Sequence, residues 1–170
     1  KEIEGLEISS ISADLYGNGR DDLTLFFFKE GANYASLTTL NSIISESLEW
    51  NKRSNRKSVK ALMVNTKNAN TFTGDQGIES LNILSKNLSK CLTIKESKKD
   101  EGVSETIKPK DILFASTGII GEEFPVEQIN NSVQNLVDKL RADQNKLIWV
   151  KSASAIMTTD TKPKLAYEEF

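Results

Sequence analysis

The sequence alternates short apolar runs with two longer stretches in which apolar residues recur every three or four positions. This period predicts two helices with one buried face each, the first over residues 78–92 and the second beginning near Pro125. The apolar residues of the two stripes are Ile78, Leu81, Leu84, Leu88 and Cys91, and then Val126, Ile129, Val133, Leu136, Val137 and Leu140. The short runs at 59–64 and 112–115 predict strands. We therefore expect residues 1–170 to form one α/β or α+β domain, a layered sandwich of sheets and helices.

A β-hairpin is predicted near the N-terminus. Residues 8–15 alternate loosely and stop at Gly17-Asn18-Gly19, which is a strong turn signal. A run rich in strand-forming residues follows at 23–28. Because this run carries apolar residues on both of its faces, we expect both faces of that strand to be covered.

Four other segments give weaker signals. Residues 35–44 are mixed and suggest a strand followed by a turn of helix. Residues 51–60 are basic and are better explained as a solvated loop than as a site for an anion. Residues 94–108 are highly charged, which indicates an exposed connection. Residues 147–150 and 153–157 are apolar and strand-like, and they end in a polar loop.

Composition excludes several kinds of site. The 170 residues include 22 Lys and Arg and 24 Asp and Glu, so the net charge is −2 and no broad basic surface for nucleic acid is expected. There is no histidine, which removes the Ser-His-Asp triad, the Cys-His pair and every histidine-containing metal site. With Cys91 as its one cysteine, the chain forms neither an intrachain disulfide nor a cysteine-cluster zinc site. No apolar run is long enough to span a bilayer and no signal peptide is found, so we expect a cytoplasmic protein.

Three polar loops follow apolar runs, at 65–74, 116–121 and 158–161, and functional sites are often built on loops at strand ends. In the second loop, a glycine N–H beside a hydroxyl can hold a developing oxyanion. Taken singly, each loop is better explained as a turn with side-chain caps. The phosphate-loop motifs are absent, and the Asn-rich first loop lacks the carboxylates of a calcium site. Glu122 and Glu123 fit solvent-facing residues before a helix better than a catalytic acid–base pair.

Taken together, the three loops resemble the ornithine acetyltransferase family, the bifunctional glutamate N-acetyltransferase and amino-acid acetyltransferase of arginine biosynthesis. The residues that match its first motif are Asn65, Asn68, Ala69, Asn70, Thr73, Gly74 and Gly77. Those that match its second motif are Ser116, Thr117, Gly118, Ile120, Gly121 and Pro125. Those that match its third motif are residues 155–161, Pro163 and Lys164, and Gly19, Arg20, Asp22 and Leu23 form a weaker match.

The resemblance implies a fold related to the self-processing N-terminal-nucleophile aminopeptidases. Members of the family are made as one precursor that cleaves itself at an Ala-Thr bond. The new N-terminal Thr of the β chain then carries acetyl from N-acetylornithine to glutamate. This sequence resembles the N-terminal α chain and stops short of the cleavage site, so it is C-terminally incomplete and does not contain the nucleophile.

The resemblance also implies roles for individual residues and for a partner. Thr117 and Gly118 match the oxyanion hole, through a hydroxyl and a backbone N–H, and Thr158 matches a substrate-binding threonine. The loop at 65–77 is expected to line or brace the site. A β chain from the same precursor is the expected partner, in an α2β2 or larger assembly with small-molecule substrates. No metal and no cofactor are expected, and the use of acetyl-CoA as a donor stays open.

Two other functions stay open. The first is an aminopeptidase or amidase of the related fold, which would share self-cleavage but release acyl groups to water. The second is a binding or structural subunit, because these residues alone contain no nucleophile. Residues 38–50 and 95–108 depart from the family pattern, which leaves room for a divergent member.

Overall fold

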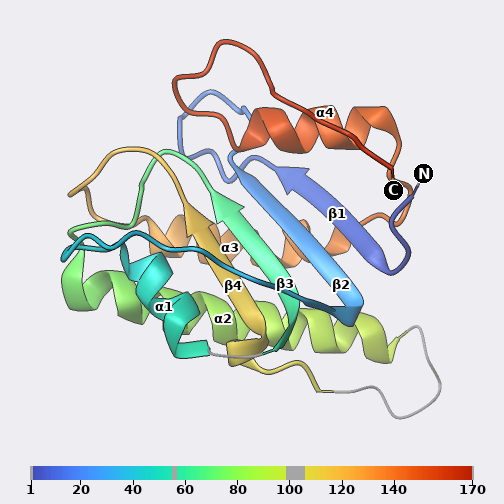
Figure 1. Cartoon of the computed structure of the whole chain (residues 1–170), viewed down its shortest axis with the longest axis horizontal. Helices are drawn as coiled ribbons and strands as arrows, with labels where there is room; N and C mark the ends of the chain where they lie inside the picture. The colour runs from blue at the N-terminus through green and yellow to red at the C-terminus, as the bar shows by residue number, and fades with distance from the viewer. Residues whose placement is uncertain (1, 55–56, 99–105, 170) are drawn as a thin grey trace.

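The computed structural model describes residues 2–54, 57–98 and 106–169, and these residues form a mixed α/β fold around a four-stranded sheet (Figure 1). The elements in chain order are β1 (Leu6–Ile11), β2 (Leu23–Asn33), α1 (Glu46–Ser54), β3 (Ser58–Asn65), α2 (Gly74–Ser97), a short 3-10 helix (Pro109–Asp111), β4 (Ile112–Ser116), α3 (Val126–Asp138) and α4 (Lys146–Ala155). The strands lie in the order β1-β2-β3-β4. The first two pairs are antiparallel, whereas β3 and β4 are parallel.

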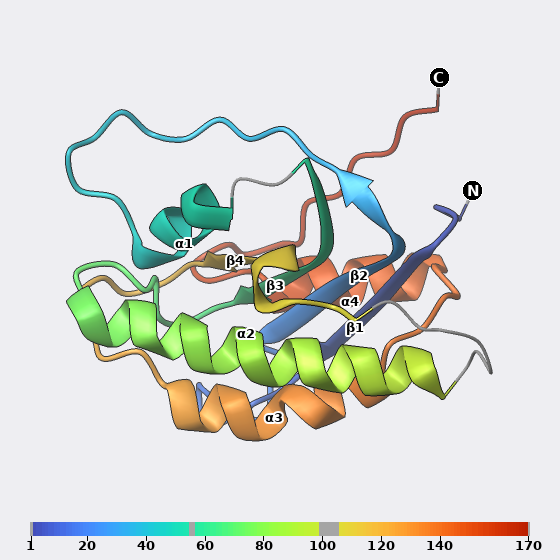
Figure 2. The same cartoon turned by 90° about the horizontal axis from the view of Figure 1, so that it is seen from below.

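Helices α2 and α3 pack against each other and against one face of the sheet, and the hydrophobic core lies between these layers (Figure 2). The strand register places Leu25, Met63 and Phe114 in one row across β2, β3 and β4, and all three are buried. The helices contribute the predicted stripes, and the fully buried leucines, isoleucines and valines among them are Leu81, Leu84, Leu88, Ile129, Val133, Leu136 and Val137. The periodic spacing in the sequence therefore marks the buried face of both helices correctly.

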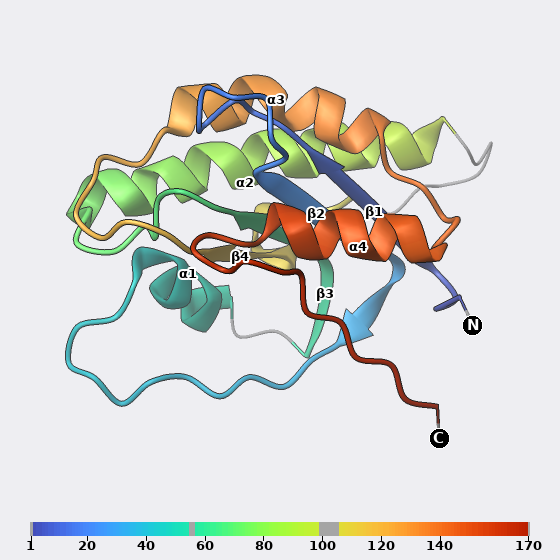
Figure 3. The ribbon, with the colours of Figure 1, turned by 90° about the horizontal axis from the view of Figure 1, so that it is seen from above.

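The opposite face of the sheet is covered unevenly. Helix α4 lies over β1 and β2, as Figure 3 shows, and Ser152 of α4 forms a 3.0 Å hydrogen bond with Ser10 of β1. On β3 and β4 the same face carries Leu62, Val64, Leu113 and Ala115, and each of these side chains keeps solvent exposure. We call these four residues the open face.

Helix α1 covers the free edge of β4 with its side chains. Trp50 Nε1 donates a 3.0 Å hydrogen bond to the carbonyl of Ile112. The Asn51 amide donates to the Phe114 carbonyl at 2.8 Å and accepts from the Phe114 N–H at 2.9 Å. An edge strand otherwise presents unpaired backbone groups, so this amide takes the place of a neighbouring strand.

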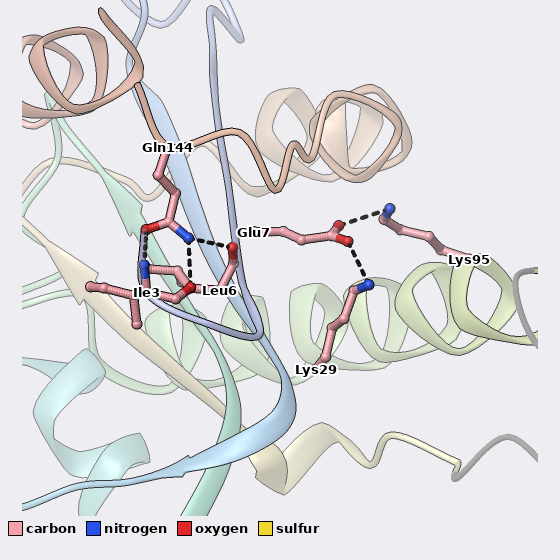
Figure 4. A network of polar contacts seen from close by, with 6 residues as sticks. All are labelled: Ile3, Leu6, Glu7, Lys29, Lys95 and Gln144. Atoms are coloured by element: carbon pink, nitrogen blue, oxygen red, sulfur yellow. Dashed lines mark hydrogen bonds and ion pairs between the residues drawn. The ribbon is translucent and has the colours of Figure 1, made fainter. Parts of the chain in front are cut away.

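Polar side chains fix β1 from both sides, as Figure 4 shows. Glu7 is buried and lies between two lysines, with Oε2 2.9 Å from Lys95 Nζ and Oε1 3.4 Å from Lys29 Nζ. Gln144, in the connection to α4, donates to the carbonyls of Ile3 and Leu6 and accepts from the Ile3 N–H. The buried carboxylate is therefore paired, which is the condition for burying a charge at acceptable cost.

The structure confirms the hairpin, the strands at 59–64 and 112–115 and the two amphipathic helices. Two predictions were wrong. Residues 35–44 contain neither strand nor helix, and residues 51–54, expected in a loop, end helix α1. The predicted connection at 94–108 begins inside α2, and its middle part, 99–105, lies outside the described residues. In the described part of the chain, no helix has the length and apolarity needed to cross a membrane.

A third prediction, that the apolar runs at 147–150 and 153–157 are strand-like, was also wrong, because helix α4 spans Lys146–Ala155. The signal that marks a helix here is Asn145, whose side chain accepts a hydrogen bond from the Ile148 N–H at 3.1 Å. This is the usual action of an N-cap residue.

Asp22 organises the connection between β1 and β2. Its carboxylate is fully buried and accepts hydrogen bonds from the backbone N–H groups of Ala13 and Leu15, both at 2.7 Å. Burial raises the pKa of the Asp22 carboxyl above its ordinary value, and the two N–H donors offset this only in part.

We expect Asp22→Ala to lower the free energy of unfolding of the full-length protein by about 2–4 kcal/mol, because two buried N–H groups lose their acceptor. Asp22→Asn should cost less, since its amide keeps one acceptor and carries no charge to desolvate. Urea unfolding measures the difference. Asp138→Ala, at an exposed position on α3, serves as the control and should change stability by less than about 0.5 kcal/mol. Equal losses in Asp22→Ala and the control would contradict the role of Asp22.

Candidate active site

The first two polar loops leave the sheet side by side. Asn65, the last residue of β3, is paired with Ser116, the last residue of β4, and with Leu23 at the start of β2. Because β3 and β4 are parallel, the loops that follow them emerge at the same edge of the sheet, as Figure 1 shows. Loops at the carboxyl ends of parallel strands are common places for ligand sites.

Backbone hydrogen bonds continue the β3–β4 pairing into these loops. The four bonds run from Thr117 N to Asn65 O (3.1 Å), from Ile119 N to Lys67 O (2.7 Å), from Ala69 N to Ile119 O (2.9 Å) and from Gly121 N to Thr71 O (2.9 Å). Two motifs that are about fifty residues apart in the chain therefore form one joined structure.

Gly118 sits at the closest approach of the two loops. Its φ angle is +140°, and a β-carbon at this position would overlap the backbone of Lys67. A glycine is therefore required here for both conformation and space.

Two hydrogen-bond donors at this point have no partner within the part of the chain that the structure describes. They are the hydroxyl of Thr117 and the backbone N–H of Gly118. Thr117 is half-buried and Gly118 is exposed, so both donors are accessible. Continuing the alternation of β4 places Thr117 on the side of Leu113 and Ala115, which is the open face. Adjacent free donors of this kind suit an anionic oxygen.

The 65–77 loop runs from the end of β3 into the first turn of α2, and between these two elements its backbone conformation is unusual. Lys67, Asn70 and Phe72 all have positive φ angles, which cost free energy in residues with a side chain. Asn70 is buried, accepts a 2.7 Å hydrogen bond from the Thr73 hydroxyl and lies against Gly77, where a β-carbon would overlap both side chains. Tertiary contacts therefore determine the conformation of this loop.

Glu46, at the start of α1, holds the end of the same loop. Its Oε1 accepts hydrogen bonds from the N–H groups of Thr73 (3.2 Å) and Gly74 (2.8 Å) at the N-terminus of α2. A carboxylate is favourable there because it satisfies free N–H groups and faces the positive end of the helix dipole. The sequence analysis did not find this residue, because it lies 27 positions before Thr73 and no local pattern links the two residues.

Glu122 and Glu123 are exposed, as expected. Asn68 Nδ2 donates to Glu122 Oε2 at 3.3 Å and to the Glu123 carbonyl at 3.2 Å, so this segment is tied to the first loop. Within the described ranges, no group of three or more His, Cys, Asp or Glu side chains is placed to hold a metal ion.

Thr158 lies in the third polar loop, which follows helix α4 and not a strand. The guanidinium of Arg20 donates to the Met157 carbonyl at 2.6 Å and stacks over the Tyr16 ring, 4.4 Å from its centroid. Arg20 comes from the β1–β2 connection, where the Asp22 carbonyl accepts the N–H of Thr66. The third loop is therefore anchored at the same end of the sheet as the other two.

Thr158 itself is half-buried, and its hydroxyl has no hydrogen-bond partner among the described residues. No hydrogen bond joins it to Thr117 or Gly118 within those residues. The structure thus brings Thr117, Gly118 and the 65–77 loop into direct contact, and it places Thr158 at the same end of the sheet without a hydrogen bond to them among the described residues.

Comparison with known proteins agrees with this arrangement. The model of the ArgJ family matches residues 7–170. The chain is 32% identical over 169 residues to the arginine biosynthesis bifunctional protein ArgJ of Caulobacter vibrioides, covering 97% of this chain and 38% of that protein. It is 32% identical over 168 residues to the ArgJ protein of Pseudomonas fluorescens, covering 99% and 37%. The chain thus spans somewhat more than a third of the length of the curated relatives it matches.

Two solved structures share the fold. The arginine biosynthesis bifunctional protein ArgJ of Bacillus halodurans superposes with a TM-score of 0.77 at 24% identity, over 93% of this chain and 74% of that one. The ornithine acetyltransferase of Mycobacterium tuberculosis, in complex with ornithine, gives a TM-score of 0.79 at 22% identity, over 93% and 78%. With the family match over residues 7–170 and relatives at 32% identity along nearly the whole sequence, the chain belongs to the ArgJ family.

Proposed function

We propose that this chain is the α chain of an acetyltransferase of arginine biosynthesis, in which it binds the oxyanion that forms during acetyl transfer. The observation that carries the proposal is the pair of free donors, the Thr117 hydroxyl and the Gly118 N–H, on a loop fixed by the neighbouring loop. Membership of the ArgJ family supplies the reaction class. The proposed reaction moves acetyl from N-acetylornithine to glutamate.

The chemistry of the proposed reaction needs these donors twice. The hydroxyl of an N-terminal Thr on the partner β chain attacks the acetyl carbonyl, and the C–N bond to ornithine then breaks as the amine takes a proton. The amine of glutamate attacks the resulting acetyl ester and releases the Thr hydroxyl. Each attack places negative charge on the former carbonyl oxygen, where donors fixed in advance stabilise the transition state more than the ground state.

The open face supports the proposal of a partner chain. Leu62, Val64, Leu113 and Ala115 form an apolar patch on the central strands, and α4 covers only β1 and β2 on that side. Leu37 and Leu40, in the segment between β2 and α1, are fully exposed. We infer that a β chain from the same precursor packs on the open face and brings its nucleophile to Thr117, which faces the same side.

We expect Leu62→Glu to prevent stable association with the β chain, because it places a charge in the middle of the contact. The variant and its partner are co-expressed, and co-purification on a tagged β chain measures association. Ile83→Glu, on the outer surface of α2, is the matched control and should leave association unchanged. Residues 1–170 that form a stable, monodisperse monomer without a partner would count against the proposal, as would a Leu62→Glu complex that forms normally.

We expect Thr117→Ala in the processed enzyme to lower kcat by about 10²–10³-fold while KM changes far less, because the lost donor acts mainly in the transition state. Mass spectrometry first establishes that the precursor has been cleaved. Kinetics of acetyl transfer from N-acetylornithine to glutamate then give kcat and KM.

The control for this variant is Thr93→Ala, a half-buried threonine near the opposite end of α2, which should keep wild-type kcat. A processed and folded Thr117→Ala enzyme that keeps more than about a third of the wild-type kcat would remove Thr117 from the oxyanion site. Release of acetate in place of acetylglutamate by the wild type would instead favour an amidase.

Thr158 is proposed as a substrate contact. We expect Thr158→Val to lower kcat/KM by about tenfold, which corresponds to one lost hydrogen bond of roughly 1–2 kcal/mol. Self-cleavage should be less affected, because the contact is made to the substrate. Steady-state kinetics and the fraction of cleaved precursor measure the two effects, and wild-type kinetics would exclude Thr158 from the site.

A further inference from the structure

Asn65 is buried at the end of β3 and joins three segments of the chain through its side chain. It is 4% exposed. Its Oδ1 accepts a 2.7 Å hydrogen bond from the hydroxyl of Ser116, at the end of β4. Its Nδ2 donates to the carbonyls of Asn68 (3.0 Å) and Thr66 (3.2 Å). The Ser116 hydroxyl is also 2.9 Å from that of Ser47 in α1.

The direction of this network follows from the number of protons. A serine hydroxyl has one proton, and Ser116 gives it to Asn65 Oδ1, which only accepts. Ser47 must therefore donate to Ser116. The carbonyls of Thr66 and Asn68, which lie on the Nδ2 side of the Asn65 amide, can only accept hydrogen bonds. The orientation of the Asn65 amide is therefore fixed. In the hydrogen-bonded series Ser47–Ser116–Asn65, the donor and the acceptor of each hydrogen bond are then defined.

This network controls the backbone on both sides of Gly118. The bond from Asn65 Nδ2 to the Asn68 carbonyl closes the turn that holds Lys67 at φ +76°. The Lys67 carbonyl accepts the N–H of Ile119, just after Gly118, and the Asn65 carbonyl accepts the N–H of Thr117, just before it. Asn65 thus determines the position of both backbone acceptors that flank the Gly118 N–H.

We propose that Asn65 is a positioning residue for the anion site: its side chain, held by Ser116, fixes the Gly118 N–H and the Thr117 hydroxyl in the geometry that binds the oxyanion. The inference rests on the proposed function, because the anion is the oxyanion of acetyl transfer. Asn65 does not itself touch the substrate, and it acts through the two hydrogen bonds that flank Gly118.

The test compares variants of the whole self-processed enzyme. Asn65→Ala removes the turn-closing donor and the acceptor of Ser116, and it should lower kcat by about tenfold or more while KM changes by less than about threefold. Ser116→Ala removes the side-chain bond to Asn65 and the acceptor of the Ser47 hydroxyl but keeps the turn-closing donor of Asn65, so it should lower kcat in the same direction by a smaller factor. Asn87→Ala is the matched control, because Asn87 also bridges two elements through its amide, from α2 to Asn130 of α3, away from the site.

Backbone amide hydrogen exchange gives a readout that does not depend on activity. The N–H groups of Thr117 and Ile119 should exchange faster in Asn65→Ala and in Ser116→Ala than in the wild type, because their acceptors are no longer held. In Asn87→Ala their exchange should be unchanged, even where the melting temperature falls.

The outcomes separate the inference from the proposed function. A lower kcat together with faster exchange at Thr117 and Ile119, absent from the control, supports the positioning role. Unchanged kcat and exchange in cleaved, folded Asn65→Ala overturn it, and so do equal losses in Asn65→Ala and Asn87→Ala. If Asn65→Ala does not fold, Ser116→Ala decides by the same two measurements. A wild-type enzyme that does not transfer acetyl from N-acetylornithine to glutamate would overturn the proposed function alone. The hydrogen-exchange comparison would still decide whether Asn65 positions the loop.

Discussion

The parallel pairing of β3 with β4 is the constraint on which the rest of the site depends. Because Asn65 lies opposite Ser116 and both strands run in the same direction, the hydrogen-bond ladder continues beyond the sheet as far as Gly121. Each loop therefore supplies backbone hydrogen-bond partners to the other. The positive φ of Lys67 is a local cost, and the fit of its carbonyl against Gly118 and Ile119 offsets it.

Helix α1 braces this arrangement from outside the sheet. Its first residue, Glu46, caps α2, Ser47 donates to Ser116, and Asn51 binds both backbone groups of Phe114. This one helix of nine residues therefore connects the edge of β4, the end of the 65–77 loop and the start of α2. Sites held by helices and strands keep their geometry better than sites held by loops alone.

The sequence predicted the elements whose signal is local. The stripes at 78–92 and 126–140 mark the buried faces of α2 and α3, and the hairpin follows from its turn residues. The polar loops at 65–74 and 116–121 were recognised, but their mutual hydrogen bonds were not, because the pairing of β3 with β4 is a long-range contact. The contact of Ser47 with Ser116 was not predicted for the same reason, because the two residues are 69 positions apart in the sequence. Helix α4 was misread because apolar, β-branched residues outweighed the Asn145 cap.

The two donors that we assign to the oxyanion share a property that bears on mechanism. Neither a threonine hydroxyl nor a backbone N–H titrates near neutral pH, and the chain contains no histidine that could. Donors of this kind keep the same electrostatic interaction with the substrate as the pH changes around neutrality. Their hydrogen-bonding groups also need not reorient at the moment of reaction. If these donors bind the oxyanion, a change in acetyl transfer between pH 6 and 8 would have to arise from groups outside the oxyanion site.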